Sequence, residues 1–339
     1  MSSLLRVVYR SNVSLSTDHI SSAVILAKRH MNLVNLTRRY SQSVCGNLTK
    51  MRIVQFKTEN DPTVRVGVIK GDTVIDINAG DKSLPNTLVG ILQQEGALET
   101  IKKLAAKSVK HHLVDEVKLV SPITNPDKVL GVALNFKDFA DKVGAPYPKE
   151  PIVFSKFPSV IVGPYDNVPK GTASNAIDWE GELVAVIGRK AKNVKASEAL
   201  DYVFGYTATQ DLTAKDWISR SGGQLIMCKN MDGFSPIGPC VVTKEELGDP
   251  HKIRIRTWVN GVLKQNGNTE NMICRIDKIV EYLSSAMTLL PGDVICTGTP
   301  YGVGSNQNPP QYLQEGDLLE TEVENVGKLS NRIINVPKK

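Results

Sequence analysis

The chain has 339 residues, of which 41% are hydrophobic and 22% are charged, a composition typical of globular proteins, and this length suits one large domain or two. No stretch approaches the roughly 18 consecutive apolar residues that a membrane-spanning helix needs, so we expect no membrane segment. The formal net charge is +6, but residues 1–40 contribute +5 of it, so the remainder is nearly neutral and gives no indication of nucleic-acid binding.

Residues 1–40 have the composition of a mitochondrial targeting peptide. They are rich in Arg and Ser, contain a single acid, Asp18, and lack the continuous apolar segment of about 7–15 residues found in secretory signals. The sequence Arg38-Arg39-Tyr40-Ser41 resembles a matrix-peptidase cleavage site. We therefore expect a mitochondrial matrix protein whose mature chain begins near Ser41. The alternative is an N-terminal extension without a targeting role.

Residues 51–122 are predicted to form a small, β-rich N-terminal subdomain. Strand-like patterns occupy residues 52–57, 64–69 and 74–77, with a turn at Lys70-Gly71-Asp72, and helix-like patterns occupy residues 86–94 and 97–109. The proline-containing segment 121–126 indicates a linker to the next domain.

Residues 127–336 are dominated by short strands and are predicted to form the main domain. Asn260-Gly261 is a strong signal for a type I′ hairpin turn between strands at 253–259 and 262–265. The other predicted strands lie at residues 129–134, 151–154, 160–163, 183–187 and 203–209, and the predicted helices lie at 136–143, 196–202, 213–219 and 275–288. These elements predict an α+β fold, mainly β, such as a sandwich or a rolled sheet.

The most informative segment of the main domain contains Glu180 and Glu182. In an extended chain, side chains two residues apart point to the same face, so these two carboxylates should lie side by side. The apolar run 183–187 that follows has the pattern of a strand buried on both faces. Two carboxylates this close repel each other unless a positive charge lies between them, and Mg²⁺ or Ca²⁺ would supply it. The alternative is an acidic edge strand that prevents aggregation.

Asp211 supplies a third carboxylate at the end of the predicted strand 203–209. Thr213 follows it as a possible helix cap, so Asp211 lies between a strand end and a helix start. No histidine occurs between residues 113 and 250, which argues against a zinc or iron centre. We therefore predict that Glu180, Glu182 and Asp211 bind a divalent cation.

Six ordered motifs, from about Met51 to Ile334, resemble the fumarylacetoacetate hydrolase superfamily. They are GVALNF at 131–136, FSKF at 154–157, DWEGEL at 178–183, QDLTAKD at 210–216, CKN at 228–230 and TGTPYGVG at 297–304. The resemblance implies a mixed β-roll, a homodimer, and a bound Mg²⁺ (or Ca²⁺ or Mn²⁺) that acts on a small dicarbonyl acid. It also assigns the metal ligands to Glu180, Glu182 and Asp211.

The resemblance assigns roles to three further residues. Lys229 matches the active-site lysine of the family, and Thr299 matches its substrate-contacting threonine. Lys156, in the FSKF motif, is predicted to join Thr299 in binding the substrate. Without the resemblance, Lys156 and Lys229 would each be interpreted as surface lysines.

The chain departs from the family at positions that matter for hydrolysis. The His–Glu dyad on the short lid of the hydrolases and decarboxylases is replaced by Phe139 and Lys142, and a family glutamine is replaced by Ile218. Because Phe139 cannot transfer a proton, activation of water is the step most affected.

Three functions remain open on the sequence. The first is keto–enol tautomerisation of a small dicarboxylate, with oxaloacetate as the expected substrate and Lys229 as the proton carrier. The second is cleavage of a C–C bond by an acylpyruvate-type hydrolase or decarboxylase. The third is a metal-binding protein with little catalytic activity that acts through partners.

Overall fold

The computed structural model describes residues 51–107 and 110–336. The predicted targeting peptide at residues 1–40 lies outside the described residues. None of the described helices is long and apolar enough to span a membrane.

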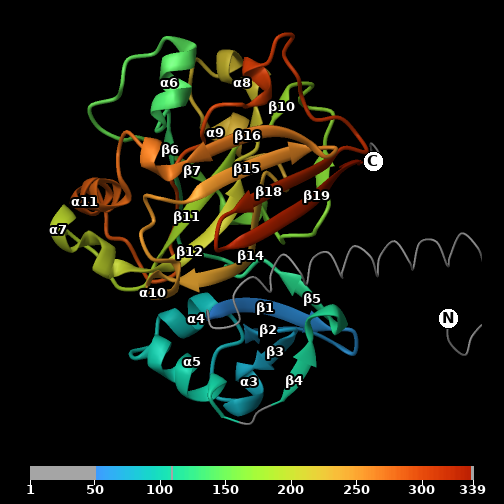
Figure 1. The fold of residues 1–339 in the computed structure, drawn as a ribbon, viewed down its shortest axis with the longest axis vertical. Coiled ribbons are helices and arrows are strands. Elements are labelled where there is room, and N and C mark those ends of the chain that lie inside the picture. Colours follow the sequence, from blue (N-terminus) through green and yellow to red (C-terminus); the bar gives the residue numbers. More distant parts are fainter. Residues whose placement is uncertain (1–50, 108–109, 337–339) are drawn as a thin grey trace, which may run out of the picture. The chain divides into compact units, whose positions relative to one another are not determined.

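The N-terminal part consists of five strands and three helices, coloured blue to green-cyan in Figure 1. Its elements are β1 (Arg52–Thr58), β2 (Asp61–Lys70), β3 (Thr73–Asp76), α3 (Ile77–Gly80), α4 (Leu88–Leu92), α5 (Ala97–Ala105), β4 (His111–Leu113) and β5 (Val117–Val120). The predicted strand 74–77 stops at Asp76 because the carboxylate of Asp76 accepts a hydrogen bond from Ala79 N and caps α3.

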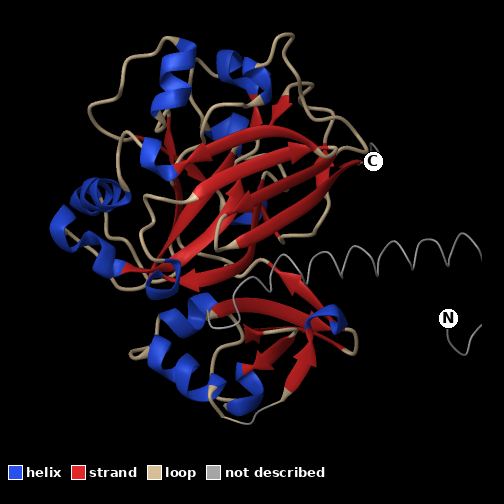
Figure 2. Cartoon of the chain, viewed as in Figure 1, coloured by secondary structure: helices blue, strands red, loops and turns tan. Residues whose placement is uncertain are grey.

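The remainder is mostly strand, with short helices at its margins (Figure 2). Its strands are β6 (Val129–Ala133), β7 (Ile152–Lys156), β8 (Ile161–Val162), β9 (Val168–Lys170), β10 (Ile177–Asp178), β11 (Gly181–Ile187), β12 (Val203–Gln210), β13 (Thr213–Ala214), β14 (Ser235–Thr243), β15 (Arg254–Val259), β16 (Val262–Asn268), β17 (Val294–Cys296), β18 (Leu318–Val323) and β19 (Gly327–Asn335). Its α-helices are α6 (Lys137–Val143), α7 (Ala196–Ala199), α8 (Lys215–Arg220), α9 (Ile226–Lys229), α10 (Lys244–Leu247) and α11 (Ile276–Ala286).

The strands form two principal sheets. The larger runs in the order β4-β3-β2-β1-β14-β12-β11-β17-β6-β7, with β5 and β8 attached to β1 and β14. It is continuous from the N-terminal part into the remainder because β1 pairs with β14. The smaller sheet runs β16-β15-β18-β19-β9, and the short strands β10 and β13 pair separately. Most pairs are antiparallel, but β6–β17, β8–β14 and β9–β19 are parallel. The α+β, mainly β prediction is therefore confirmed.

Strand β11 is buried on both faces, as its apolar run predicted. On one face, Leu183 and Ala185 belong to the core that includes Ile255 and Val323 of the smaller sheet. On the other face, Val184 and Val186 belong to a second core, to which α4 and α5 contribute Leu88, Ile91 and Ile101. Because both faces are buried, a one-residue slip of β11 would displace every core contact, and its register is firmly set.

One local feature was predicted from the sequence and another was not. The type I′ turn is confirmed, since Asn260 and Gly261 both have positive φ, 52° and 78°. Strand β14 was not among the predicted strands, and its Pro236 and Pro239 are unusual residues for an interior strand. The structure accommodates Pro239 at an irregularity of the β12–β14 pairing, between Tyr206 and Ala208, where no regular ladder bond is required.

Candidate active site

Glu180, Glu182 and Asp211 are brought together by the pairing of β11 with β12. Gly181 is paired with Gln210, so Glu180 and Asp211 lie directly beyond this pair, and Glu182 is the second residue of β11. Ligand oxygens from all three carboxylates lie within 4.8 Å of one another, and all three residues are buried. The burial excludes the alternative of a solvated edge strand.

The backbone between the two glutamates is fixed by two buried glutamines. Gln210 Oε1 accepts a hydrogen bond from Glu180 N at 2.7 Å, and Gln265 Oε1 accepts one from Gly181 N at 2.9 Å. A side chain at Gly181 would not fit, since its Cβ would lie 2.4 Å from Thr257 Oγ1. These contacts set the positions of the two carboxylates that Gly181 separates.

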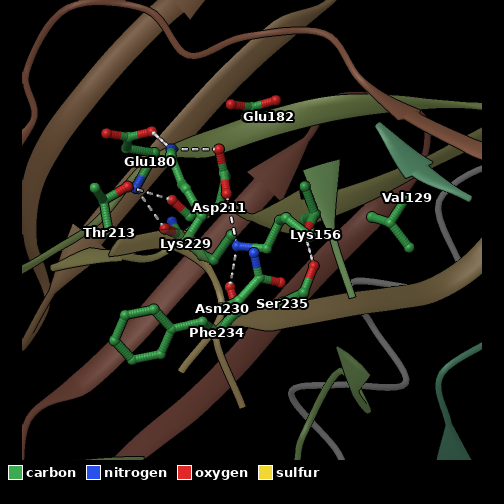
Figure 3. Close-up of polar contacts among 12 residues, drawn as sticks. Val129, Lys156, Glu180, Glu182, Asp211, Thr213, Lys229, Asn230, Phe234 and Ser235 are labelled. Carbon is green, nitrogen blue, oxygen red and sulfur yellow. Dashed lines mark hydrogen bonds and ion pairs between the residues drawn. The ribbon is translucent and has the colours of Figure 1, made fainter. Parts of the chain in front are cut away.

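Three lysines from separate elements surround the carboxylates, as Figure 3 shows for two of them. Lys229 of α9 donates to Glu180 Oε2 at 2.6 Å and also to Asp211. Lys156 of β7 donates to Asp211 Oδ1 at 2.7 Å and to the carbonyl of Phe234. Lys215 of α8 donates to Glu180 Oε1 at 2.5 Å. The interpretation of Lys156 and Lys229 as surface lysines is wrong, because they are 1% and 4% exposed.

The two glutamates differ in electrostatic environment. Burial acts to raise the pKa of Glu180, but the charges of Lys215 and Lys229 outweigh it and lower the pKa to about 2. Burial and repulsion by Asp211 raise the pKa of Glu182 well above its usual range. Glu182 accepts a hydrogen bond from Gly298 N at 2.8 Å, and within the described residues it forms no ion pair with a lysine.

The neighbouring carboxylates also act on the charge of Lys229. Burial by itself would lower its pKa, but the adjacent Asp211 and Glu180 carboxylates more than offset this and raise it above the usual value. The Lys229 side chain therefore supplies the positive charge that balances these two carboxylates.

The donor set fits a hard divalent cation. It consists of carboxylate oxygens alone, which Mg²⁺, Ca²⁺ and Mn²⁺ prefer, and no histidine of the described residues lies among them. Glu182 is the specific reason to expect a cation here, because its carboxylate is buried beside two other acids and, within the described residues, has no ion pair with a lysine. The arrangement predicted for Glu180, Glu182 and Asp211 is thus present.

A cavity of about 150 Å³ opens onto the carboxylates. Its polar lining includes the three acids, Lys229, Lys215, Thr213 and Thr299; its other lining residues are Val132, Ala133, Leu134, Phe139, Phe154, Ile218 and Leu225. Lys156, which was predicted to contact the substrate, is not part of this lining; it lies behind Asp211.

Helix α6 contributes one side chain to the cavity, and two of its other side chains contact Tyr301. Phe139 lines the cavity, whereas the ammonium of Lys142 lies over the Tyr301 ring, 5.5 Å from its centroid. Asp138 accepts a hydrogen bond from Tyr301 N at 3.4 Å. At the two positions of the family dyad, Phe139 therefore lines the cavity with an apolar ring, and Lys142 contacts the 297–304 loop.

Sequence reasoning missed several residues of this site. Lys215 lay within a recognised motif, but nothing local indicated that it pairs with Glu180. Gln265 is also buried, and nothing in the predicted hairpin strand 262–265 indicated a role for it. Phe154 is paired with Gly131 across β6 and β7. The glycine is required there because a Cβ at position 131 would lie 2.2 Å from the Phe154 ring.

The family model for the fumarylacetoacetate (FAA) hydrolase C-terminal domain matches residues 128–334. The chain belongs to the fumarylacetoacetate hydrolase family. It is 41% identical over 315 residues to "Oxaloacetate tautomerase fahd2, mitochondrial" of Xenopus laevis, covering 91% of this chain and 97% of the relative. It is also 41% identical over 288 residues to the human "Oxaloacetate tautomerase FAHD2A, mitochondrial", covering 84% and 92%.

Solved structures agree with this membership. A fumarylacetoacetate hydrolase from Exiguobacterium antarcticum aligns with a TM-score of 0.74 at 31% identity, covering 84% of this chain and 100% of that chain. Maleylpyruvate hydrolase from Sphingobium, solved with manganese(II) and pyruvate, aligns with a TM-score of 0.71 at 26% identity, covering 85% and 100%. The chain is thus an enzyme of a metal-dependent family, and its relatives place it in mitochondria.

Proposed function

We propose that this protein is a Mg²⁺-dependent mitochondrial oxaloacetate tautomerase, which interconverts the keto and enol forms of the substrate. The observation that carries the proposal is the cavity itself. It combines three buried carboxylates and an ammonium group, Lys229, with an apolar Phe139 in place of a water-activating histidine. The names of the relatives support the same activity.

The carboxylates of Glu180, Glu182 and Asp211 would hold the cation, with Ca²⁺ or Mn²⁺ as alternatives to Mg²⁺. A bound divalent cation supplies Lewis acidity, which stabilises negative charge on the oxygens of a dicarbonyl acid. Lys215 and Lys156 fix the orientation of Glu180 and Asp211 from outside this triad.

Lys229 is the proposed proton carrier. Conversion of an enol to a ketone requires a proton on carbon C3 and loss of a proton from the enol oxygen. Lys229 Nζ is buried and lines the cavity, so it is placed to deliver a proton to C3 and to take up the proton that the enol oxygen loses, which leaves its own charge unchanged after each turnover. A divalent cation held by Glu180 and Asp211 would offset the negative charge that stabilises the Lys229 ammonium and so ease this transfer.

Apolar side chains exclude water from the same space. Phe139, Ile218 and Leu225 line the cavity, and none of them can polarise a water molecule. A closed, dry site favours proton transfer over hydrolysis. The C–C hydrolase or decarboxylase alternative would need a group that activates water, but the position of the family histidine holds Phe139 and that of the family glutamine holds Ile218. The third alternative, a protein with little activity, would leave Lys229 only the role of balancing the charges of Glu180 and Asp211.

The test is an assay of purified protein with Mg²⁺ on enol-oxaloacetate and, in parallel, on acetylpyruvate. We expect rapid loss of enol absorbance and slow or absent cleavage of acetylpyruvate. Lys229→Ala should lower the tautomerase kcat on the order of 10²-fold or more, the usual contribution of a general acid–base group.

Two further variants complete this assay. Lys229→Arg keeps the charge that balances Glu180 and Asp211 but holds its proton too tightly to transfer it, so it should also be slow. The exposed Lys252→Ala serves as the control and should retain wild-type activity. Brisk cleavage of acetylpyruvate by a wild type that ignores enol-oxaloacetate would show that the tautomerase proposal is wrong.

A further inference from the structure

The Thr299 hydroxyl is held by two groups that do not belong to the substrate. Thr299 Oγ1 donates to the carbonyl of Gly181 at 2.9 Å and accepts from Gln265 Nε2 at 2.7 Å. Gln265 is fully buried, and its Nε2 also donates to the carbonyl of Pro300 at 2.9 Å. Thr299 itself is only half-buried and lines the cavity.

The direction of each of these bonds follows from the fixed polarity of the backbone. The N–H of Gly181 can only donate, so it must face Gln265 Oε1, which it does at 2.9 Å. The carbonyl of Pro300 can only accept, so it must face Gln265 Nε2. The amide of Gln265 is therefore oriented without ambiguity, and the group that it presents to Thr299 is an N–H donor.

The orientation of Gln265 determines the orientation of the Thr299 hydroxyl. A hydroxyl has one hydrogen and two acceptor positions. Gln265 occupies one acceptor position, and the hydrogen points to the carbonyl of Gly181. The second acceptor position has no partner among the described residues. Towards the cavity, Thr299 is consequently an acceptor and not a donor.

We propose that Gln265 is a positioning residue that makes Thr299 an acceptor for a hydrogen on the substrate, so that the site recognises the enol hydroxyl. This inference rests on the proposed tautomerase function and refines it. At neutral pH a dicarboxylate in its keto form presents only acceptor oxygens, whereas its enol form carries one O–H donor. Thr299 thus contributes selectivity for the enol form, and Gln265 enforces it from outside the cavity.

The experiment compares two ligands of nearly equal shape, oxalate and oxamate, by calorimetric titration in the presence of Mg²⁺. Oxamate carries an NH₂ donor where oxalate has a carboxylate oxygen. Thr299→Val removes the acceptor, so oxamate should bind about 3- to 10-fold more weakly while oxalate is unaffected, in line with the net contribution of one hydrogen bond. Gln265→Met frees the Thr299 hydroxyl to turn, so the ratio of oxamate to oxalate affinity should fall by a similar factor.

Each variant has a matched control. Thr297→Val makes the same change two residues away, at a hydroxyl that donates to the carbonyl of Leu183 outside the cavity lining. Gln210→Met removes the other buried glutamine, which contacts Glu180 N, Thr257 and Thr321 but not Thr299. Both controls should leave the affinity ratio of the two ligands unchanged, even if the absolute affinities fall.

Three outcomes would overturn the inference. The first is a Thr299→Val variant that weakens oxalate and spares oxamate, because the hydroxyl would then be a donor into the cavity. The second is an equal change of the ratio in Gln265→Met and Gln210→Met, and the third is a wild type that binds neither ligand. None of these readouts depends on turnover. A protein without tautomerase activity could still show the predicted change in the oxamate-to-oxalate affinity ratio, and an active tautomerase could fail to show it.

Discussion

Glu182 differs from the other acids of the site, because within the described residues no lysine forms an ion pair with it. Burial and the nearby charge of Asp211 raise its pKa, which means that its charged form is held at a cost to stability. Lys229 and Lys215, by contrast, neutralise Glu180. A divalent cation bound at this site would account for a carboxylate kept in such surroundings.

This view of Glu182 predicts opposite effects with and without metal. Without a divalent cation, in EDTA, Glu182→Gln should have a melting temperature equal to or above that of wild type, because an unfavourable buried charge has been removed. With Mg²⁺, wild type should gain stability through binding to the folded state, and the variant should gain little. Melting temperatures and Mg²⁺ titrations measure both effects. The exposed Glu315→Gln is the control, and an equal Mg²⁺ response in all three proteins would contradict the assignment.

At the scale of one element, helix α11 begins without a side-chain cap of its own. Arg275, at the N-cap position, makes no such bond, and the N–H of Ile276 instead donates to Nε2 of the buried His251, 3.1 Å away. Just before the helix, Asn135 bonds to the backbone of Cys274 and, through a second contact, to the carbonyl of Thr297. The start of α11 is therefore connected to the loop that carries Thr299.

The cap by His251 predicts a pH dependence of stability. Burial, and then the guanidinium of Arg275, lower the pKa of His251 below its usual value, although Asp277 and Asp249 oppose this. The unfolded chain therefore binds a proton at a higher pH than the folded chain does. Stability from this group is fully present above about pH 6.5 and is lost as the pH falls towards the folded pKa.

His251→Gln provides the measurement, since a glutamine amide oxygen can still accept from Ile276 N but does not titrate. Between pH 7.5 and 5.5, wild type should lose on the order of 1 kcal/mol more unfolding free energy than the variant. Urea denaturation at the two pH values gives this difference. Parallel losses in both proteins would exclude His251 as the titrating group.

At the scale of the whole molecule, the described sheets begin at Arg52, which lies after the segment 1–40 that is predicted to be removed on import. Cleavage near Ser41 would leave every described strand intact. The homodimer implied by the family resemblance stays a prediction, as does the mature N-terminus.

The targeting prediction is tested by comparing the full chain with a chain that starts at Ser41. Purified, the two should have the same melting temperature and Mg²⁺ affinity, whereas in cells only the full chain should reach mitochondria. N-terminal sequencing of the mitochondrial protein should give a residue near Ser41. Recovery of an intact Met1 from mitochondria would refute the predicted cleavage.

The sequence by itself determined the strand β11, the shared face of Glu180 and Glu182, and the type I′ turn at Asn260-Gly261. These features depend on local backbone geometry: alternation along a strand, a continuous apolar run, and residues that accept positive φ. Asp211 could be added because it ends a strand of recognisable composition. The family motifs contributed Lys229 and Thr299 as expectations.

Only the tertiary structure decided how the carboxylates are neutralised and how Thr299 is oriented. Lys156 reaches Asp211 across 55 residues of sequence, and Gln265 reaches Gly181 across 84. The sequence around a single lysine or glutamine in a short strand shows no periodicity that would indicate whether its side chain is buried with a partner or exposed to solvent. Its role is set by strand pairing and sheet packing between distant segments, because burial is what turns an ordinary polar side chain into one with a fixed partner and a fixed direction.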